Sequence, residues 1–200
     1  GSLDIDGFFN EESHYSPNNP YAATKASSDH LVQSWNKTFG LPIKITNCSN
    51  NYGPWQHKEK LISKTILNCL KYKKVPIYGN GKNIRDWIFI EDHIEALLTV
   101  AERGNIGSTY CIGGNNEISN LEVIKKICSY FDEIIPSKAP HNKLLKFIKD
   151  RPGHDYRYAI DCSKIKNELN WSSKYTLKEG LKLTINWSLE RYSKNKNATL

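Results

Sequence analysis

The sequence predicts an α/β protein, because segments with helical and strand periodicity alternate along its 200 residues. Apolar residues between 20 and 39 recur with the spacing of one helix face, and residues 42–47 alternate as in a strand. The same alternation of helix and strand continues to the last forty residues. A hydrophobic content of 38% with 24% charged residues is typical of a folded globular chain and argues against disorder.

The first half contains two predicted helices and three predicted strands. A turn-rich loop precedes a helix that begins near Pro20, whose ring suits a first helical turn, and that ends at Gly40. The elements that follow are, in order, a strand at 42–47, a polar loop at 49–54, a helix at 61–70 and strands at 75–78 and 85–90. Residues 79–81 between the last two strands are expected to form a hairpin turn.

The second half continues the alternation. Apolar residues between 94 and 101 predict a helix that stops at Gly104, and residues 109–112 predict a strand. Ser119 and Glu122 have the spacing of a capping box that opens another helix. The remaining elements are a loop at 151–155, a short strand at 158–160 and two closing helices, the second opened by the capping box of Thr176 and Glu179.

Charge and composition exclude several classes of protein. The net charge of +7 comes from scattered lysines, so a basic cleft for a small phosphorylated ligand is favoured over a nucleic-acid surface. No apolar run approaches the ~20 residues of a membrane span, and no signal peptide is recognisable, so a cytoplasmic location is expected. The five cysteines are odd in number and lack a CxxC pair, which disfavours a disulfide framework and a metal site.

Tyr21 and Lys25 are the first candidates for chemistry. They lie four residues apart on the predicted helix, hence on the same face. An ammonium group near a phenol favours the phenolate, which can accept a proton from an alcohol while hydride leaves the same carbon. The spacing alone is a weak signal, since a surface tyrosine beside a lysine arises often by chance. The Pro- and Asn-rich loop just before the pair strengthens the interpretation.

Residues 19–30 around this pair resemble the active-site helix of extended short-chain dehydrogenase/reductases, and more narrowly of dTDP-glucose 4,6-dehydratases. The same family pattern continues in six further stretches, at 46–54, 59–62, 76–79, 84–87, 151–155 and 158–161. The resemblance covers the chain from about Gly7 to Tyr192. Several motifs in the right order are far more specific than the Tyr21–Lys25 spacing alone.

The resemblance implies a fold and an activity. Residues 1–53 would be the carboxy-terminal part of a Rossmann-type NAD-binding domain, and 54–192 mainly a small mixed α/β domain that binds the nucleotide sugar. Residues 85–103 could pack back on the first part, and 193–200 would be a tail. The family converts dTDP-glucose to dTDP-4-keto-6-deoxyglucose with bound NAD, in deoxysugar (rhamnose-type) biosynthesis. The resemblance also implies a homodimer that forms through the helix Tyr21–Phe39.

The resemblance also implies site residues. Tyr21 would be the base that helps to oxidise the C4 hydroxyl, and Tyr21, Lys25 and Asn51 would contact NAD. The sugar nucleotide would be bound by Asn50, Lys60, Leu61, Pro76, Tyr78, Arg85, Asn120, Arg151 and His154, with Pro76 and Tyr78 bracketing the thymine. Plainer alternatives stay open: Arg85 could pair with Asp86, Tyr78 could be core, and Arg151 could brace a turn.

The sequence departs from the family at two places. It contains neither the glycine-rich turn that seats the NAD pyrophosphate nor the Thr-Asp-Glu motif that eliminates water. The isolated chain is therefore expected to be a fragment that is inactive by itself. Two rivals remain: a related nucleotide-sugar epimerase or decarboxylase, and a non-catalytic remnant that only binds a dTDP-sugar. Paired Asn50 and Asn51 and the run 151–155 favour the dehydratase.

Overall fold

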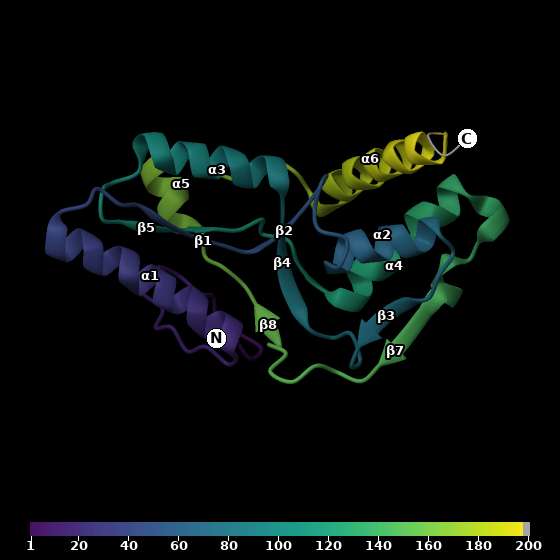
Figure 1. Ribbon diagram of the computed structural model, residues 1–200, viewed down its shortest axis with the longest axis horizontal. Helices are drawn as coiled ribbons and strands as arrows, with labels where there is room; N and C mark the ends of the chain where they lie inside the picture. Colours follow the sequence, from purple (N-terminus) through teal and green to yellow (C-terminus); the bar gives the residue numbers. More distant parts are fainter. Residues whose placement is uncertain (198–200) are drawn as a thin grey trace.

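The structure, a computed structural model, describes residues 1–197 and confirms the α/β class (Figure 1). The elements of the amino-terminal half are α1 (Pro20–Phe39), β1 (Ile45–Cys48), β2 (Asn50–Tyr52), α2 (Leu61–Leu70), β3 (Val75–Tyr78), β4 (Ile84–Phe89) and α3 (Ile90–Arg103). Those of the other half are β5 (Thr109–Ile112), β6 (Glu117–Ser119), α4 (Asn120–Ile134), η1 (Pro136–Lys138), η2 (His141–Leu144), β7 (Leu145–Ile148), β8 (Arg157–Tyr158), α5 (Ser163–Leu169) and α6 (Leu177–Asn197).

Short strands form three separate sheets. β1 pairs with β5 and β3 with β7, both in parallel. β4 lies at the centre of the third sheet, parallel to β2 and β8 and antiparallel to β6. The expected hairpin at 79–81 is therefore wrong. Gly79 and Gly81 adopt φ angles of 56° and 71°, and their turn sends the chain from one sheet into another.

Two hydrophobic cores lie at opposite ends of the molecule (Figure 1). The smaller core packs α3 and α5 on β5 and is centred on Val100, Tyr110 and Ile165. The larger core joins α2, α4 and α6, with Ile66, Phe131 and Ile185 fully buried. The central sheet around β4 connects them, since Ile88 belongs to the smaller core and Trp87 and Phe89 to the larger. The strand β4 thus contributes side chains to both cores, and segments of the two cores alternate along the chain.

The helix α1 has an unusual environment, because none of its residues is buried. Asn19 caps its first turn by accepting a hydrogen bond from the Ala22 N–H at 2.9 Å, and Gly40 ends it in the left-handed conformation with φ 68°. Leu31, Trp35 and Phe39 expose between 53% and 70% of their surface. The helix therefore presents an apolar face that no other element within residues 1–197 buries.

Two further differences concern the carboxy-terminal third. The short strand expected at 158–160 is found as β8 at Arg157–Tyr158, and Ile160 pairs instead with Phe9 in an isolated bridge. Residues 193–197, expected as a tail, continue the backbone of α6, while 198–200 lie outside the described residues. Both predicted capping boxes are confirmed: Ser119 with Glu122 opens α4, and Thr176 with Glu179 precedes α6. Within residues 1–197 no helix meets the length and apolarity that crossing a bilayer requires.

Asp86 ties the loop between β5 and β6 to the central strand. Its carboxylate is almost completely buried and accepts hydrogen bonds from the Gly114 N–H at 2.9 Å and the Asn116 N–H at 2.7 Å. Burial raises the pKa of Asp86, and the two N–H groups act against that rise. The alternative in which Asp86 pairs with Arg85 is wrong, because the carboxylate is used by this loop.

Candidate functional site

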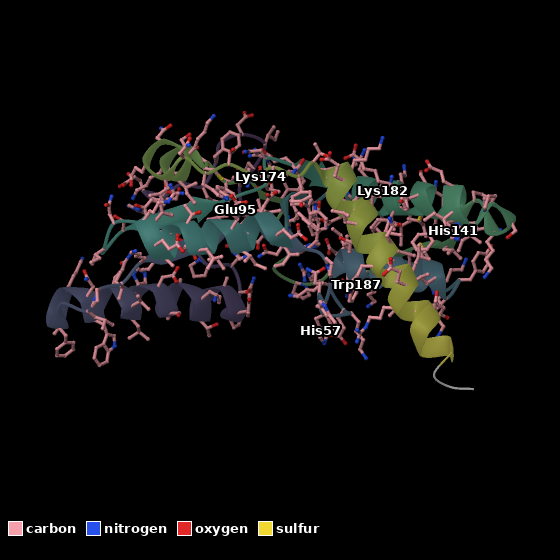
Figure 2. All side chains as sticks on the ribbon, turned by 90° about the horizontal axis from the view of Figure 1, so that it is seen from above. His57, Glu95, His141, Lys174, Lys182 and Trp187 are labelled. Atoms are coloured by element: carbon pink, nitrogen blue, oxygen red, sulfur yellow. The ribbon has the colours of Figure 1, made fainter. Side chains whose placement is uncertain are left out.

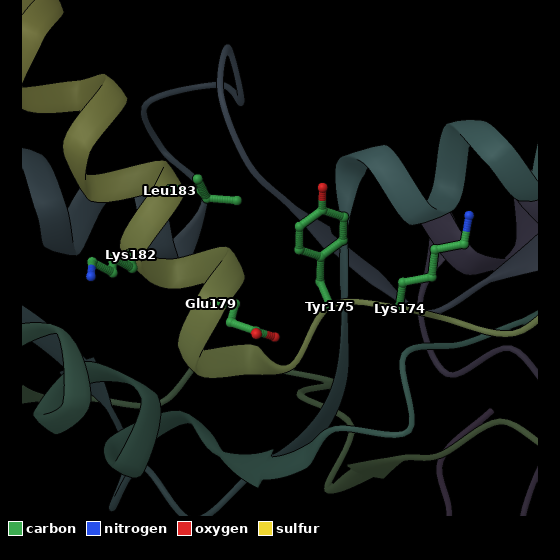
Figure 3. Close-up of a pocket in the computed structure, with 5 residues that line it drawn as sticks. All are labelled: Lys174, Tyr175, Glu179, Lys182 and Leu183. Carbon is green, nitrogen blue, oxygen red and sulfur yellow. The ribbon is translucent and has the colours of Figure 1, made fainter.

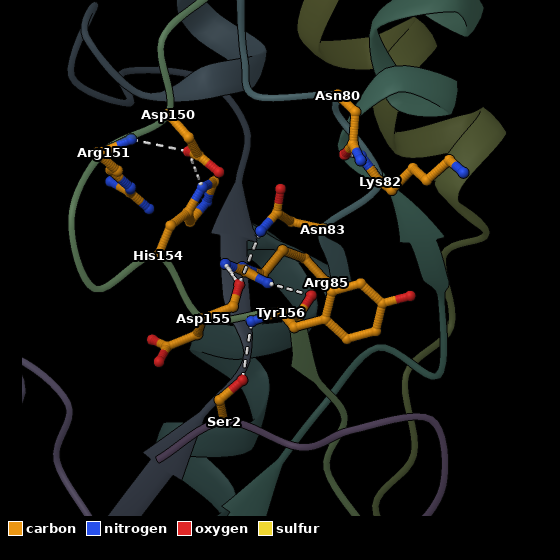
Figure 4. Close-up of polar contacts among 10 residues, drawn as sticks. All are labelled: Ser2, Asn80, Lys82, Asn83, Arg85, Asp150, Arg151, His154, Asp155 and Tyr156. Atoms are coloured by element: carbon orange, nitrogen blue, oxygen red, sulfur yellow. Dashed lines mark hydrogen bonds and ion pairs between the residues drawn. The ribbon is translucent and has the colours of Figure 1, made fainter.

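A turn at residues 150–154 brings a histidine and an arginine together (Figure 4). The Asp150 carboxylate accepts a hydrogen bond from the Arg151 backbone N–H at 2.8 Å and contacts the His154 Nδ1 at 2.7 Å. The His154 side chain is nearly buried, whereas Arg151 is exposed. Within residues 1–197 the Arg151 guanidinium has no ion-pair partner, so it does not brace the turn. It remains available to a ligand.

Arg85, on β4, places a buried guanidinium beside this turn. Its Nη1 donates to the carbonyls of Ile84 at 2.7 Å and Tyr156 at 3.3 Å, and its Nη2 donates to the Asp155 carbonyl at 2.7 Å (Figure 4). Guanidinium has five N–H groups. The Nε–H and one Nη2–H are therefore left without a partner among the described residues. The described residues give this buried cation carbonyl acceptors but no carboxylate at ion-pair distance, which favours an incoming anion.

The ionisation states of the site follow from burial and neighbouring charge. Burial lowers the pKa of Arg85, Arg151 lowers it further, and Asp155 acts in the opposite direction. Burial also lowers the pKa of His154, while its hydrogen bond to Asp150 opposes this shift. That hydrogen bond holds the pKa of Asp150 below its usual value. Together these directions describe a neutral imidazole whose Nδ1–H donates to an ionised carboxylate at neutral pH.

The lowered pKa of His154 predicts a pH dependence of stability. Because the unfolded histidine titrates near 6.5 and the folded one below it, the stabilisation is complete above that pH. It is lost as the pH falls through 6.5 towards the folded pKa. We expect the free energy of unfolding, measured in urea between pH 8 and 5.5, to fall less steeply in His154→Asn than in the wild type. His93, whose pKa is also lowered by burial, stays in both proteins and cancels in the comparison. Identical slopes would contradict this assignment.

The end of β3 lies against the same turn. Gly79 donates its backbone N–H to the Ile148 carbonyl at 3.0 Å, and a Cβ added at Gly79 would come within 2.7 Å of the Asp150 Oδ2. Tyr78, the preceding residue, exposes 40% of its surface, so the alternative that it is core is wrong. Pro76 is half-buried two residues earlier. The strand end thus offers a flat aromatic ring next to the basic turn.

Asn120 is linked through Asn83 to the cluster formed by Arg85, Arg151 and His154. The Asn120 backbone N–H donates to the Asn83 carbonyl at 2.9 Å, and the Asn83 side chain donates to the Asp155 carbonyl at 3.1 Å. The Asn120 side chain lies at the amino terminus of α4, and its Oδ1 is buried without a partner among the described residues. A buried acceptor without a donor is costly, so this oxygen is suited to a ligand hydroxyl or N–H.

The first turn of α1 lies beside the residues that hold Arg85. The Asn18 side chain donates to the Asp155 Oδ1 at 2.9 Å, and a Cβ added at Gly153 would lie 3.3 Å from the Asn18 carbonyl oxygen. Tyr21 follows in that turn with 74% of its surface exposed, and Lys25 is also exposed one turn later. The structure therefore brings the helix that carries Tyr21 next to the 151–155 segment, more than 120 residues away in sequence.

A second group of predicted residues lies on β2 and at the start of α2. Asn50 is exposed, and the Asn51 Oδ1 is buried without a partner in the described part of the chain. Lys60 is the residue before α2, exposed, and Leu61 is the first residue of the helix. Within residues 1–197 no hydrogen bond or ion pair joins Asn50 or Lys60 to Arg85 or Arg151. The two groups are joined through the β2–β4 pairing and through the packing of α2 on β3.

The predicted residues line neither of two hollows in the surface. One, of about 500 Å³, is bordered by Lys174, Tyr175, Glu179, Lys182 and Leu183 (Figure 3). The Lys174 ammonium there already contacts Glu95 at 2.7 Å, and Glu179 adds a second carboxylate to the border of the hollow. The other, of about 360 Å³, is bordered by Lys82, Ile84, Glu117, Ile118, Ser119, Glu122 and Tyr156. Only the second adjoins the cluster, through Ile84 and Tyr156.

Several residues that organise the site were missed from the sequence. Asp150 orients His154, while Asn83, Asp155 and Tyr156 hold Arg85 and Asn120 in place. Asp150 could have been found, because it lies four residues before His154 and directly before Arg151. The role of the carbonyls of Asp155 and Tyr156 could not, since backbone oxygens leave no signal in the sequence.

Comparisons with known proteins agree with this picture. A family model described as GDP-mannose 4,6 dehydratase matches residues 1–184. The dTDP-glucose 4,6-dehydratase of Haemophilus influenzae is 53% identical over 185 residues, which are 90% of this chain and 55% of that protein. The Neisseria meningitidis serogroup B enzyme of the same name is 50% identical over 189 residues, 92% of this chain and 53% of that protein. The chain spans about half the length of these relatives.

Solved structures of two NAD-bound enzymes are similar to this chain. The Bacillus anthracis dTDP-glucose 4,6-dehydratase in complex with NAD has a TM-score of 0.88 and 42% identity, covering 96% of this chain and 59% of that one. The Bacillus cereus UDP-glucuronic acid 4-epimerase, in complex with UDP-glucuronic acid and NAD, has a TM-score of 0.84 and 28% identity, covering 96% and 59%. With a family model matching 184 of its residues, this chain belongs to the GDP-mannose 4,6-dehydratase family.

Proposed function

We propose that this chain is part of a dTDP-glucose 4,6-dehydratase and binds the nucleotide diphosphate of its substrate between Arg85, Arg151 and His154. The observation that carries the proposal is the buried Arg85 guanidinium, which keeps two N–H groups free beside an exposed arginine and a histidine. Two N–H groups of one guanidinium can contact two phosphate oxygens at once. The sequence identity of 53% and 50% with two dTDP-glucose 4,6-dehydratases supports this assignment of the reaction.

The rest of the nucleotide sugar would occupy the neighbouring strand ends. Tyr78 and Pro76 would bracket the thymine, because Tyr78 presents an exposed ring beside the Asp150 turn. The unpaired Asn120 Oδ1 would accept a hydrogen bond from the nucleotide. Asn50, Lys60 and Leu61 would contact the substrate from β2 and the start of α2. A sugar on the diphosphate would extend towards Tyr21, since Asn18 and Asp155 hold α1 against this segment.

NAD is the cofactor of the proposed reaction, and it supplies the acceptor for the hydride from the sugar C4. The residues present fit its nicotinamide end: Tyr21 and Lys25 are exposed on one face of α1, and the Asn51 Oδ1 is a buried acceptor without a partner among the described residues. Tyr21 would take the proton of the C4 hydroxyl, and Lys25 would hold the ribose. The sequence has no glycine-rich turn for the pyrophosphate.

The proposal predicts selective stabilisation by dTDP. A ligand at 100 times its Kd stabilises the folded state by about 2.7 kcal/mol, which raises the Tm of a chain of this size by roughly 5–10 °C. We expect dTDP to give such a shift in a thermal unfolding experiment and UDP at the same concentration a smaller one. An equal or larger shift with UDP would favour a nucleotide-sugar epimerase, as the likeness to the Bacillus cereus enzyme allows. No shift with either nucleotide would exclude the binding site.

Homodimerisation, a cytoplasmic location and a place in deoxysugar biosynthesis belong to the same proposal. The dimer is supported by α1, which buries none of its residues and exposes 53% of Trp35 and 70% of Phe39. Two copies of this face would cover each other's apolar surface. We expect sedimentation equilibrium to give a dimer for the wild type and a monomer for Trp35→Glu, and a wild-type monomer would contradict the interface.

A further inference from the structure

The loop between β2 and α2 is attached to the last helix by a stack of three side chains. Trp55 exposes 71% of its surface, yet the Arg191 Cζ lies 3.9 Å from the centre of its ring. The Trp187 ring, labelled on α6 in Figure 2, lies 5.3 Å from the Trp55 ring and 5.5 Å from the same Arg191 Cζ. Trp187 and Arg191 are one turn apart on α6, so both reach Trp55 from one helix face.

The backbone of Trp55 requires such support. Its φ angle of 65° is left-handed, a conformation that a bulky residue without a special environment rarely adopts. Among the described residues no carboxylate lies within ion-pair distance of Arg191. The guanidinium is therefore held by the two aromatic faces, and arginine over tryptophan is a favourable cation–π pair.

Gln56 fastens the same loop from the other side. Its Nε2 donates to the Asn51 carbonyl at 2.6 Å, and its Oε1 accepts a hydrogen bond from the Ser63 hydroxyl at 3.0 Å. Asn51 lies on β2, and Ser63 lies in the first turn of α2. One side chain thus spans the two elements that carry Asn51 and Leu61, with Lys60 between them.

We propose that Arg191 and Gln56 are positioning residues that hold the loop 53–60 closed, and with it Asn51 and Lys60, in the geometry that binds the nucleotide sugar. The inference rests on the proposed function for the roles of Asn51 and Lys60. In this proposal neither Arg191 nor Gln56 contacts the nucleotide sugar directly. Arg191 acts through Trp55, and Gln56 acts through the Asn51 carbonyl and the start of α2. Loss of either leaves the two cores intact and lets the loop open locally.

Hydrogen–deuterium exchange of the full chain tests the positioning without any ligand. Two loop amides have hydrogen-bond acceptors, since Gln56 N–H donates to the Gly53 carbonyl at 3.4 Å and Lys60 N–H to the His57 carbonyl at 3.0 Å. We expect Arg191→Ala to speed exchange of the peptide covering 53–61 by about tenfold, with Arg191→Lys giving a smaller change because it keeps the charge without the flat stack. Gln56→Ala should act on the same peptide. Lys182→Ala, an exposed cation on α6 outside the stack, is the matched control.

Titration with dTDP then separates this inference from the proposed function. If the wild type binds dTDP, Arg191→Ala should weaken binding by about threefold to tenfold at an unchanged Tm, whereas Lys182→Ala should not. If the wild type does not bind, the proposed function fails, and the exchange data still decide whether the stack holds the loop. Unchanged exchange of 53–61 in Arg191→Ala, or equally faster exchange across α2 and α4, would overturn the positioning role.

Discussion

Replacing Gly114 with alanine is expected to lower the free energy of unfolding by about 3 kcal/mol or more. A Cβ at this position would lie 2.0 Å from the Trp87 carbonyl oxygen and 3.0 Å from the Ile88 Cα. Both are backbone atoms of β4, which cannot move aside as a side chain does. The shift needed would also break the hydrogen bond from Gly114 to the buried Asp86 carboxylate. The buried Asp86 carboxylate would then keep the Asn116 N–H but lose one of its two backbone donors, which is costly for a buried charge.

Urea unfolding of Gly114→Ala beside Gly40→Ala separates the clash from the general effect of adding a methyl group to a glycine. A Cβ at Gly40 meets no atom within 4 Å, and only its φ of 68° opposes the change. The free energy of unfolding of Gly40→Ala should therefore fall by only about 1 kcal/mol. Equal losses in the two variants would show that the 113–116 loop is not packed on the central strand as the structure has it.

Replacing Arg85 with lysine is expected to weaken dTDP binding by about 100-fold. Charge-assisted hydrogen bonds contribute about 1.5–3 kcal/mol each, and lysine cannot supply the two free N–H groups to phosphate while also reaching three carbonyls. The carbonyls of Ile84, Asp155 and Tyr156 would lose their donor, so the variant should also be less stable. Calorimetric titration and thermal unfolding measure the two effects separately.

Arg151→Lys is the matched control for that experiment. Arg151 is exposed, and its guanidinium has no described partner, so its loss should weaken dTDP binding by about tenfold with no loss of stability. Binding that is insensitive to both arginines would remove the diphosphate from this site. If the variants lose dTDP affinity only in proportion to their loss of stability, Arg85 has a structural role and does not bind the diphosphate.

The sequence predicted those features that depend on local spacing. The helix from Pro20 to Phe39, its glycine stop and both capping boxes were predicted because each rests on residues within one or two turns. The pairing of β3 with β7 rather than β4 was not, because nearly 70 residues separate those strands and turn residues alone do not specify a partner. For the same reason, the sequence did not predict that the two cores are built from interleaved segments.

The candidate site also has a part that the sequence predicted and a part that it did not. The residue types were evident from the motifs, but the support around them was not. His154 depends on Asp150, and Arg85 depends on three carbonyls that any residue could provide. The closeness of α1 to residues 153–155 comes from contacts between distant loops. Catalytic roles for Tyr21 and Lys25 stay predictions, since both side chains are exposed and their action requires ligands.

A crystal structure of the chain with dTDP tests the central claim most directly. We predict that the diphosphate lies within hydrogen-bond distance of Arg85 and Arg151, with a phosphate oxygen at His154 Nε2 and the thymine ring against Tyr78. Finding dTDP instead in the hollow between Lys174 and Lys182, or only on surface lysines with Arg85 still confined to its three carbonyls, would contradict the assignment.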